Sequence, residues 1–262
     1  MKPSAVTREL FEIQTVTVPK IVQSSLNPFI DLKSSTFIDF GCDLGLKTYG
    51  YSKSIGLRKI VGIDIQDNFV NLPQVLNKIV GDAALPDNLE FMAIEKGGSL
   101  DRLSPADGFI SWSVFEHIDR DVLMRVAGDL FDTLRPGAVS FVQVNPLYLS
   151  PYGSHLRHIL DTPWQHLFFE GDDLKEHILA KLNFNHQAAE AAWSLYLSLN
   201  RLRFADFVQC FSGAGFTTLK TSIAKTQEVP PAELTCKYAV EDLQLEGFQL
   251  VLKKPETEHP IR

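Results

Sequence analysis

Six short, continuous runs of apolar residues, rich in β-branched and aromatic side chains, recur along the chain. They are Thr36 to Phe40, Lys59 to Ile65, Leu89 to Ile94, Gly108 to Trp112, Ala138 to Val144 and Gly247 to Leu252. Runs of this kind predict β-strands, and apolar residues at successive positions indicate burial on both faces of a sheet. A further strand is expected over Phe216 to Ile223.

Between these runs the apolar residues change to helical spacing. The plainest case is Arg120 to Leu134, where apolar side chains repeat every three or four residues until Pro136 and Gly137 follow. Alternating strands and helices predict a doubly wound α/β fold with a mostly parallel sheet, because parallel neighbours need a crossover connection. Ligands of such sheets bind outside the carboxyl ends of the strands, so functional residues are expected there.

The connection after the fifth predicted strand is too long for a single crossover. Within it we expect helices over Asp172 to Lys181, His186 to Leu199 and Arg201 to Ala214. Loops of this length are typically lids or binding elements. We therefore divide the chain into an N-terminal helical extension (1–35), a Rossmann-like core (36–145), a substrate-binding insertion or lid (146–200), the C-terminal part of the core (201–253) and a frayed tail (254–262).

Composition excludes several classes of function. Hydrophobic residues make up 45% of the chain and charged residues 22%, as in ordinary globular proteins. The 25 Lys and Arg against 32 Asp and Glu give a net charge of -7, so no nucleic-acid partner is expected. No apolar run approaches the roughly 18 residues of a membrane span. The three cysteines, Cys42, Cys210 and Cys236, lack disulfide or zinc spacing, which favours the cytoplasm.

A turn with two glycines follows the first predicted strand, in the segment Asp39-Phe-Gly41-Cys-Asp43-Leu-Gly45. Glycines let the backbone approach a ligand, so a side chain at either position is expected to fill the ligand's space. An acid between the glycines disfavours the pyrophosphate of a dinucleotide. The second strand ends at Asp64, 19 residues after Gly45, where a carboxylate can accept from both hydroxyls of a ribose. Ribose without pyrophosphate predicts a nucleoside cofactor.

The turn resembles the first motif of the class I S-adenosylmethionine-dependent methyltransferases, with Asp43 at the middle glycine, where its carboxylate can pair with the cofactor's ammonium. The resemblance covers about residues 36 to 145, and the chain is most similar to methyltransferases of types 11 and 23. It implies S-adenosyl-L-methionine as cofactor. The residues that it assigns to the cofactor are Asp39, Gly41, Cys42, Asp43, Gly45, Asp64, Ile65, Glu95, Lys96, Trp112 and Ser113.

Two acids compete for the adenine side of this cofactor. Glu95 follows the third predicted strand, whereas Asp82 lies in Gly81-Asp82-Ala83 before that strand. Assigning the adenine to Asp82 would leave a strand without a place in the family's pattern. The resemblance therefore favours Glu95.

Glu116 and His117 follow the fourth predicted strand. They can either cap the next helix or stand beside the reactive methyl group at the carboxyl end of the strand. In ubiquinone-pathway and some RNA-terminal O-methyltransferases a similar segment reads Glu-x-x-Glu-His and holds a divalent metal. In this chain Ser113 replaces the first glutamate, so no metal is expected unless a histidine of the insertion completes the site.

Three histidines, His155, His158 and His166, lie close together in the predicted insertion. Histidine is suited to accept a proton near neutral pH. We assign the catalytic role to a histidine among His117, His155 and His166, and we expect His158 to be a bystander.

Aromatic side chains with polar tips are also frequent in the insertion, where they can form core or stack on a planar or sugar ring. Substrate contacts are assigned to Glu116, Tyr148, Tyr152 and Trp164. Trp193 and Tyr196 lie on a predicted helix and are expected to be core residues.

Together these features predict methyl transfer from S-adenosylmethionine to a hydroxyl of a small molecule or saccharide. A hydroxyl keeps its proton at neutral pH and benefits from a base, whereas an amine needs only to be neutral. Two alternatives are an N-methyltransferase and a catalytically inactive, cofactor-binding partner subunit. The substituted Asp43 leaves the second alternative open.

Overall fold

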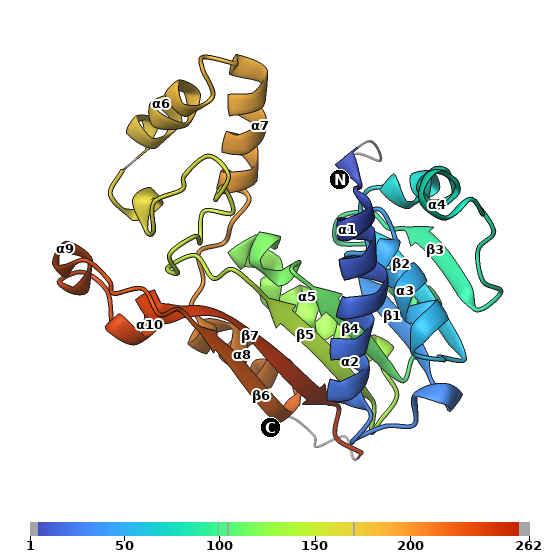
Figure 1. Ribbon diagram of the computed structural model, residues 1–262. Helices are drawn as coiled ribbons and strands as arrows, with labels where there is room; N and C mark the ends of the chain where they lie inside the picture. Colours follow the sequence, from blue (N-terminus) through green and yellow to red (C-terminus); the bar gives the residue numbers. More distant parts are fainter. Residues whose placement is uncertain (1–4, 99, 104, 170, 257–262) are drawn as a thin grey trace.

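A computed structural model describes residues 5–256 except 99, 104 and 170, and a seven-stranded sheet forms its centre (Figure 1). The spatial order of the strands is β3-β2-β1-β4-β5-β7-β6. Their bounds are β1 Thr36–Phe40, β2 Lys59–Asp64, β3 Leu89–Ala93, β4 Gly108–Trp112, β5 Val139–Val144, β6 Thr217–Lys225 and β7 Leu245–Lys253. The first five strands pair in parallel, and β7 is antiparallel to β5 and β6. The expected doubly wound, mostly parallel α/β sheet is confirmed.

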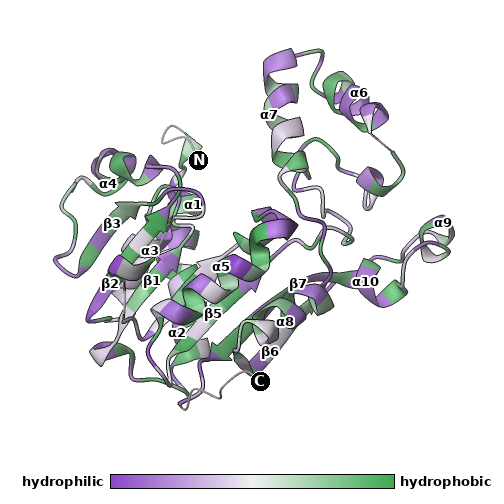
Figure 2. Ribbon diagram, turned by 180° about the vertical axis from the view of Figure 1, so that it is seen from behind, coloured by the Kyte–Doolittle hydropathy of each residue, from purple (hydrophilic) through white to green (hydrophobic). Residues whose placement is uncertain are grey.

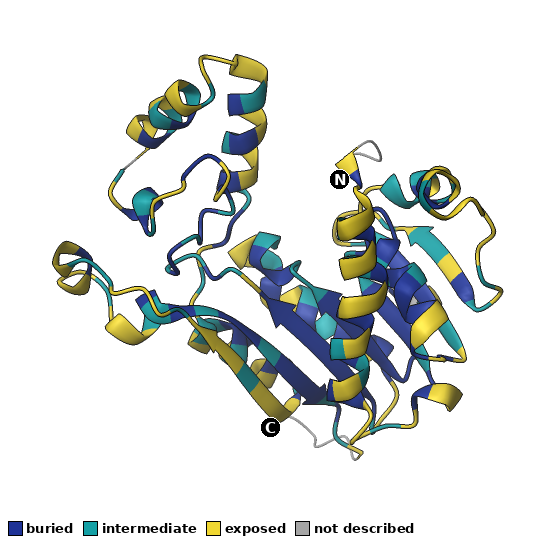
Figure 3. Ribbon diagram, in the orientation of Figure 1, coloured by how far each residue is buried: buried dark blue, intermediate teal, exposed yellow. Residues whose placement is uncertain are grey.

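Helices cover both faces of this sheet. On one face α2 (Val18–Leu26) and α3 (Leu46–Ser54) share a hydrophobic cluster with the strands. On the other face α5 (Arg120–Thr133) and α8 (Phe204–Gly213) share a second cluster. The central strands between them are apolar and buried (Figures 2 and 3). All six residues of β5 are buried, which explains why four of them are apolar, with only Ser140 and Gln143 polar.

The remaining helices outside the insertion are short. They are α1 Arg8–Glu12, α4 Leu72–Val80, α9 Ala232–Thr235, α10 Val240–Gln244, the π-helical η2 Ile13–Thr17 and the 3-10 turns η3 Leu32–Ser34, η4 Asn68–Asn71, η5 Asp101–Leu103 and η6 Phe115–His117. Together α1, η2 and α2 make residues 8–26 a continuous helical stretch, in agreement with the expected helical N-terminal extension. Residues 1–4 of that extension lie outside the described part. In the described part of the chain, no helix has the length and apolar content that a membrane crossing requires.

The insertion, residues 146–200, folds as a small helical unit beyond the carboxyl end of β5 (Figure 1). It contains η7 (Gln165–Leu167), α6 (Asp172–Lys181) and α7 (His186–Leu197). Side chains of α6 and α7 form a separate hydrophobic cluster with Leu156 and Ile159. The helix expected over 172–181 is confirmed, and the one expected over 186–199 ends two residues early, at Leu197.

One expected helix start is wrong by three residues. The helix expected from Arg201 begins at Phe204, because Arg201 has a φ of 58°, in the left-handed region that an α-helix excludes. The tail expected from Lys254 is anchored at its start. The buried Lys254 ammonium donates to the carbonyl oxygens of Phe131 (2.9 Å) and Leu134 (2.8 Å). Residues 257–262 of the expected tail lie outside the described residues.

Candidate functional site

A pocket opens at the carboxyl ends of β1, β2 and β3, and we name it the edge pocket. Sequence-predicted residues that line it are Gly41, Asp64, Ile65, Glu95, Lys96 and His117. Its other wall includes Val122, Arg125, Val126 and Asp129 of α5, which sequence reasoning missed. Their spacing of three and four residues, which places them on one face of the helix, is the signal that could have identified them.

Asp64 is held in one orientation in the edge pocket by two backbone amides. Its Oδ2 accepts from the amide of Asp43 at 2.8 Å, and its Oδ1 accepts from the amide of Gln66 at 2.9 Å. Each carboxylate oxygen keeps a second lone pair for a further donor. The carboxylate can therefore accept from the two hydroxyls of a ribose without losing its own support, so the pocket fits the nucleoside part of the expected cofactor.

The glycine turn also serves the packing of the protein itself, and Gly41 lines the edge pocket as well. Gly41 and Gly45 both have left-handed backbone, with φ of 78° and 79°. A Cβ on Gly41 would overlap a methyl group of Val114, and one on Gly45 would lie 2.6 Å from the ring of Phe91. Asp43 between them is also left-handed, and its Oδ1 accepts from the Asn68 amide at 2.8 Å.

The other residues assigned to the cofactor lie outside the edge pocket. Asp39 is fully buried, and its Oδ2 accepts from the Thr48 hydroxyl at 2.6 Å; burial raises the pKa of Asp39 to about 6. Cys42 is buried too, and burial raises the pKa of its thiol. The Trp112 ring stacks on Phe141, whereas the Ser113 hydroxyl lies 2.9 Å from Gln143 Oε1.

Glu116, His117 and His155 come together at the edge of the sheet, and we name them the Glu-His-His cluster. One ligand atom from each lies within 4.8 Å of the others, and the two imidazole centroids are 5.1 Å apart. Glu116 and His117 come from η6 after β4, whereas His155 comes from the insertion, at a left-handed φ of 61°. Sequence reasoning singled out all three residues but did not predict that they meet.

Burial decides the charge of these groups. Glu116 is 4% exposed, and neither of its carboxylate oxygens has a hydrogen-bond partner among the described residues. Desolvation raises the pKa of Glu116 to about 8. It also lowers the pKa of His117 to about 4 and moves the pKa of His155 downward. Both imidazoles are therefore neutral near pH 7.

Hydrogen bonds assign the tautomer of each imidazole. The Ser198 hydroxyl donates to the carbonyl of Leu195 at 2.7 Å, so it accepts from Nδ1 of His117 at 2.8 Å. The carbonyl oxygen of Pro146 can only accept, so Nε2 of His155 is the donor at 3.0 Å. The lone pairs that remain are on Nε2 of His117 and Nδ1 of His155.

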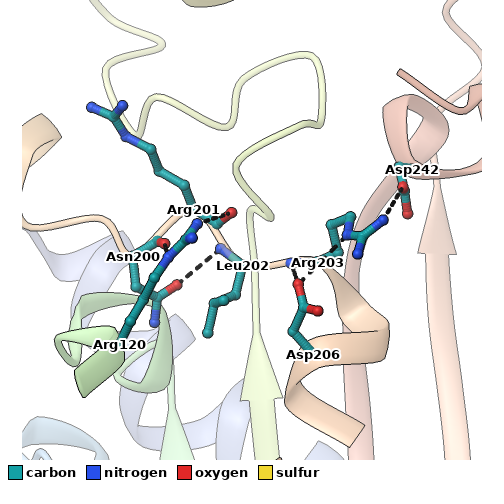
Figure 4. Close-up of polar contacts among 7 residues, drawn as sticks. All are labelled: Arg120, Asn200, Arg201, Leu202, Arg203, Asp206 and Asp242. Atoms are coloured by element: carbon teal, nitrogen blue, oxygen red, sulfur yellow. Dashed lines mark hydrogen bonds and ion pairs between the residues drawn. The ribbon is translucent and has the colours of Figure 1, made fainter. Parts of the chain in front are cut away.

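The end of the insertion is fastened to the loop that carries Glu116 and His117. Asn200 donates its side-chain amide to the carbonyl oxygens of Phe115 (2.7 Å) and Ile118 (3.0 Å) and its backbone amide to Glu116 O (2.8 Å). Arg120 in turn donates to the carbonyl oxygens of Asn200 and Arg201 (Figure 4). These hydrogen bonds fix the backbone that carries Glu116 and His117. No sequence motif identifies Asn200 as the residue that makes them.

A second pocket lies on the other side of His155, and we name it the insertion pocket. It is lined by Asn145, Pro146, Ser150, Tyr152, His155, Arg157 and Glu246. The guanidinium of Arg157 lies 4.2 Å from the centre of the Tyr152 ring. The Glu-His-His cluster therefore touches both pockets, through His117 on the edge side and His155 on the insertion side.

His166 and Trp164 are core residues of the insertion, which corrects their assignment to the site. His166 is 2% exposed, and its Nε2 lies 2.7 Å from the carbonyl oxygen of Tyr148. Trp164 is 1% exposed, and its indole donates to the carbonyl oxygens of Leu149 and Leu243. Neither lines the edge pocket or the insertion pocket.

Four other residues of the insertion that the sequence singled out lie in its core, beside the insertion pocket or at the surface. Tyr148 is half-buried, and its hydroxyl lies 2.8 Å from that of Tyr196, a buried core residue as expected. Tyr152 lines the insertion pocket. His158 is exposed.

The chain was compared with known proteins. No protein-family model matches it, and no curated protein does. Solved structures are similar in fold: a methyltransferase of Haloferax volcanii in complex with the activator Trm112 (15% identity, TM-score 0.53, 96% of this chain and 92% of that one), and magnesium protoporphyrin IX methyltransferase of Synechocystis (13% identity, TM-score 0.54, 91% and 82%). A [4+2]-cyclase is also similar (12% identity, TM-score 0.54, 91% and 81%).

At these identities the likeness concerns the fold and leaves the reaction open, as the cyclase illustrates. The Synechocystis enzyme was solved with S-adenosylhomocysteine and with S-adenosylmethionine bound. The chain has the Rossmann-like fold of the class I methyltransferases.

Proposed function

We propose that the protein is an S-adenosylmethionine-dependent methyltransferase that acts on a hydroxyl of a small molecule or saccharide. The observation that carries the proposal is the position of the Glu-His-His cluster. It stands between the edge pocket, which fits a nucleoside, and the insertion pocket, which is available for an acceptor. Side chains that lie between the cofactor and the acceptor are in the position from which they can activate the acceptor.

S-adenosylmethionine supplies an electrophilic methyl group on a sulfonium. On the protein side, Asp64 would receive the ribose hydroxyls, and Glu95 is available to the adenine side of the edge pocket. Four acids line the pocket, Asp64, Glu95, Asp119 and Asp129, against the two bases Lys96 and Arg125; Lys96 pairs with Asp119 at 2.8 Å. The excess of acids favours a cationic ligand. The cofactor-bound neighbours of the same fold support this assignment.

The neutral imidazoles favour a hydroxyl acceptor over an amine. Their free lone pairs, on Nε2 of His117 and Nδ1 of His155, can help a hydroxyl to lose its proton. Arg157, Glu246 and Tyr152 give the insertion pocket donors and acceptors of the kind that a hydroxyl-rich molecule requires. Glu116 and Tyr152 are the residues that we assign to the acceptor side.

The test is methyl transfer from methyl-labelled S-adenosylmethionine to phenols, monosaccharides and matched amines. We expect label on a hydroxyl, and we expect His155→Ala to reduce its transfer while His158→Ala, in the same insertion but exposed, does not. Label found on amines alone would contradict the hydroxyl assignment. Cofactor binding without transfer to any acceptor class would favour a non-catalytic cofactor-binding subunit.

A further inference from the structure

We infer that a third pocket, which we name the arginine pocket, binds the phosphate group of a small phosphate monoester. The pocket lies where the insertion returns to the core, and its polar and aromatic lining consists of Arg120, Tyr148, Arg201, Arg203, Asp206 and Tyr238. It shares no lining residue with the edge pocket or the insertion pocket. The inference therefore does not depend on the reaction that the protein catalyses.

The first argument is the charge of the lining. Of the three arginines, Arg203 has acid partners, with N–O distances of 3.6 Å to Asp206 and 4.0 Å to Asp242. Arg120 and Arg201 form no ion pair with an acid in the part of the chain that the structure describes. Two positive charges thus remain in one pocket of a chain whose net charge is -7. Such a local excess favours an anionic ligand.

The second argument is that Arg201 is held in place with its donors free. Its guanidinium lies 5.1 Å from the centre of the Tyr148 ring and 5.1 Å from the centre of the Tyr196 ring. It points away from the carboxylates of Asp206 and Asp242 (Figure 4). Contacts with ring faces orient a guanidinium and leave its five N–H donors available. These donors form the planar fork that fits the oxygens of a phosphate group.

The third argument is the backbone of Arg201. Its φ of 58° lies in the left-handed region, which glycine adopts without cost and which is unfavourable for a residue with a Cβ. Unfavourable backbone of this kind persists where the surrounding structure holds it, and it occurs often at ligand sites. A long cationic side chain at such a position indicates that the side chain itself has a use.

Arg120 and Tyr238 supply further donors. Arg120 donates Nε to the carbonyl oxygen of Asn200 and Nη2 to that of Arg201, which orients its guanidinium and leaves Nη1 without an acceptor among the described residues. The Tyr238 hydroxyl likewise has no hydrogen-bond partner in the described ranges. The pocket therefore offers several N–H and O–H donors to one anionic group.

The number of donors and the charge indicate the class of anion. A phosphate monoester places a charge of about -1.5 to -2 and three acceptor oxygens on a single group at pH 7. A carboxylate group has one negative charge and two oxygens. Two unpaired guanidinium groups match the phosphate better, and the Tyr148 and Tyr238 rings give the organic part of the ligand an apolar surface.

The test is calorimetric titration of the full chain with phenyl phosphate and glucose 6-phosphate, with succinate as a carboxylate of similar charge. We expect both phosphate monoesters to bind more tightly than succinate. Arg201→Gln removes the free fork and should weaken phosphate binding by about 10- to 100-fold. Circular dichroism checks that the variant folds. Arg201→Gly, which suits the left-handed backbone, gives the same readout if Arg201→Gln does not fold.

Two other exposed arginines provide the controls. Arg157 also lies over a tyrosine ring, that of Tyr152 at 4.2 Å, but it belongs to the insertion pocket, and Arg102 lines none of the three pockets. Arg157→Gln and Arg102→Gln should bind phenyl phosphate as the wild type does. An equal loss in either control and in Arg201→Gln would overturn the site, as would absence of binding at millimolar phenyl phosphate. Succinate binding as tight as that of phenyl phosphate would overturn the class of ligand.

Discussion

Nδ1 of His117 lies 2.8 Å from the hydroxyl of Ser198, although 81 residues separate them in the sequence. This contact joins the loop after β4 to the segment in which the insertion returns to the core. It fixes the tautomer of His117, because the Ser198 hydroxyl already donates to Leu195. The folded state of the insertion therefore controls which nitrogen the Glu-His-His cluster presents.

Asp64→Ala is expected to weaken S-adenosylmethionine binding by about 1.5–3 kcal/mol for each charge-assisted hydrogen bond to the ribose. The reason is that the carboxylate is the oriented acceptor of the edge pocket. Calorimetry with the cofactor measures the loss. Asp82→Ala removes the exposed acid that competes for a cofactor role, and it should bind as the wild type does. Equal affinities for the two variants would refute the ribose assignment.

Gly41→Ala is expected to destabilise the fold as well as the site. Left-handed backbone costs a side chain about 1–2 kcal/mol, and the contact with Val114 adds an overpacking cost of about 1–3 kcal/mol. Gly56 has the same φ of 78° but open space around it, so Gly56→Ala measures the backbone cost alone. Urea unfolding of both variants checks this. If the two variants lose the same stability, the contact with Val114 costs nothing.

His166 should make the protein less stable in acid. Burial lowers its pKa to about 4 in the folded state, below the ordinary value of 6.5, so between these values the unfolded chain binds the proton more tightly. Stability is intact above pH 6.5 and falls as the pH drops to about 4, by at most about 1.4 kcal/mol per pH unit.

The comparison for this effect is His166→Gln, whose amide can still donate to the carbonyl of Tyr148. The unfolding free energies of the wild type and of this variant are measured from pH 4 to 8. Above pH 6.5 both should depend on pH in the same way, and below pH 6.5 the wild type should lose stability more steeply. Parallel curves over the whole range would show that His166 does not titrate differently on folding.

His155→Ala is expected to lower turnover by about 10²–10⁴-fold and to leave S-adenosylmethionine affinity nearly unchanged. His155 lies on the insertion side of the cluster, away from the edge pocket. Steady-state rates and cofactor calorimetry separate the two effects, with His158→Ala as the matched control. The cluster has no part in activating the acceptor if His117→Ala and His155→Ala both keep more than half of the wild-type turnover.

Asn200→Ala should loosen the loop that carries Glu116 and His117. It leaves the carbonyl oxygens of Phe115 and Ile118 without their donor, at a cost of about 1–3 kcal/mol for each buried group. Hydrogen exchange of the amides of residues 115–118 should accelerate. Asn77→Ala, at an exposed position of α4, should change neither stability nor exchange. Unchanged exchange in Asn200→Ala would show that the side-chain amide of Asn200 does not hold the loop.

The strands and most helices could be predicted from the sequence because they depend on local patterns. β1 and β4 have the predicted bounds, and α6 begins and ends where its spacing indicates. A strand buried between two helical layers requires apolar residues at successive positions, and such a run can be recognised in the sequence. The helix start at Phe204 could not be read this way, because it depends on the left-handed backbone of Arg201.

The candidate site also has one part that could be predicted from the sequence and one part that could not. The carboxyl ends of parallel strands meet at one edge, so Gly41, Asp64 and Glu95 could be placed around one pocket from the sequence alone. His155 could not be told from His158 and His166, since all three are histidines of one irregular segment. Only the tertiary structure buried His166, left His158 in solvent and brought His155 to Glu116. The physical reason is that packing and hydrogen bonds between distant segments select the side chain that faces the core.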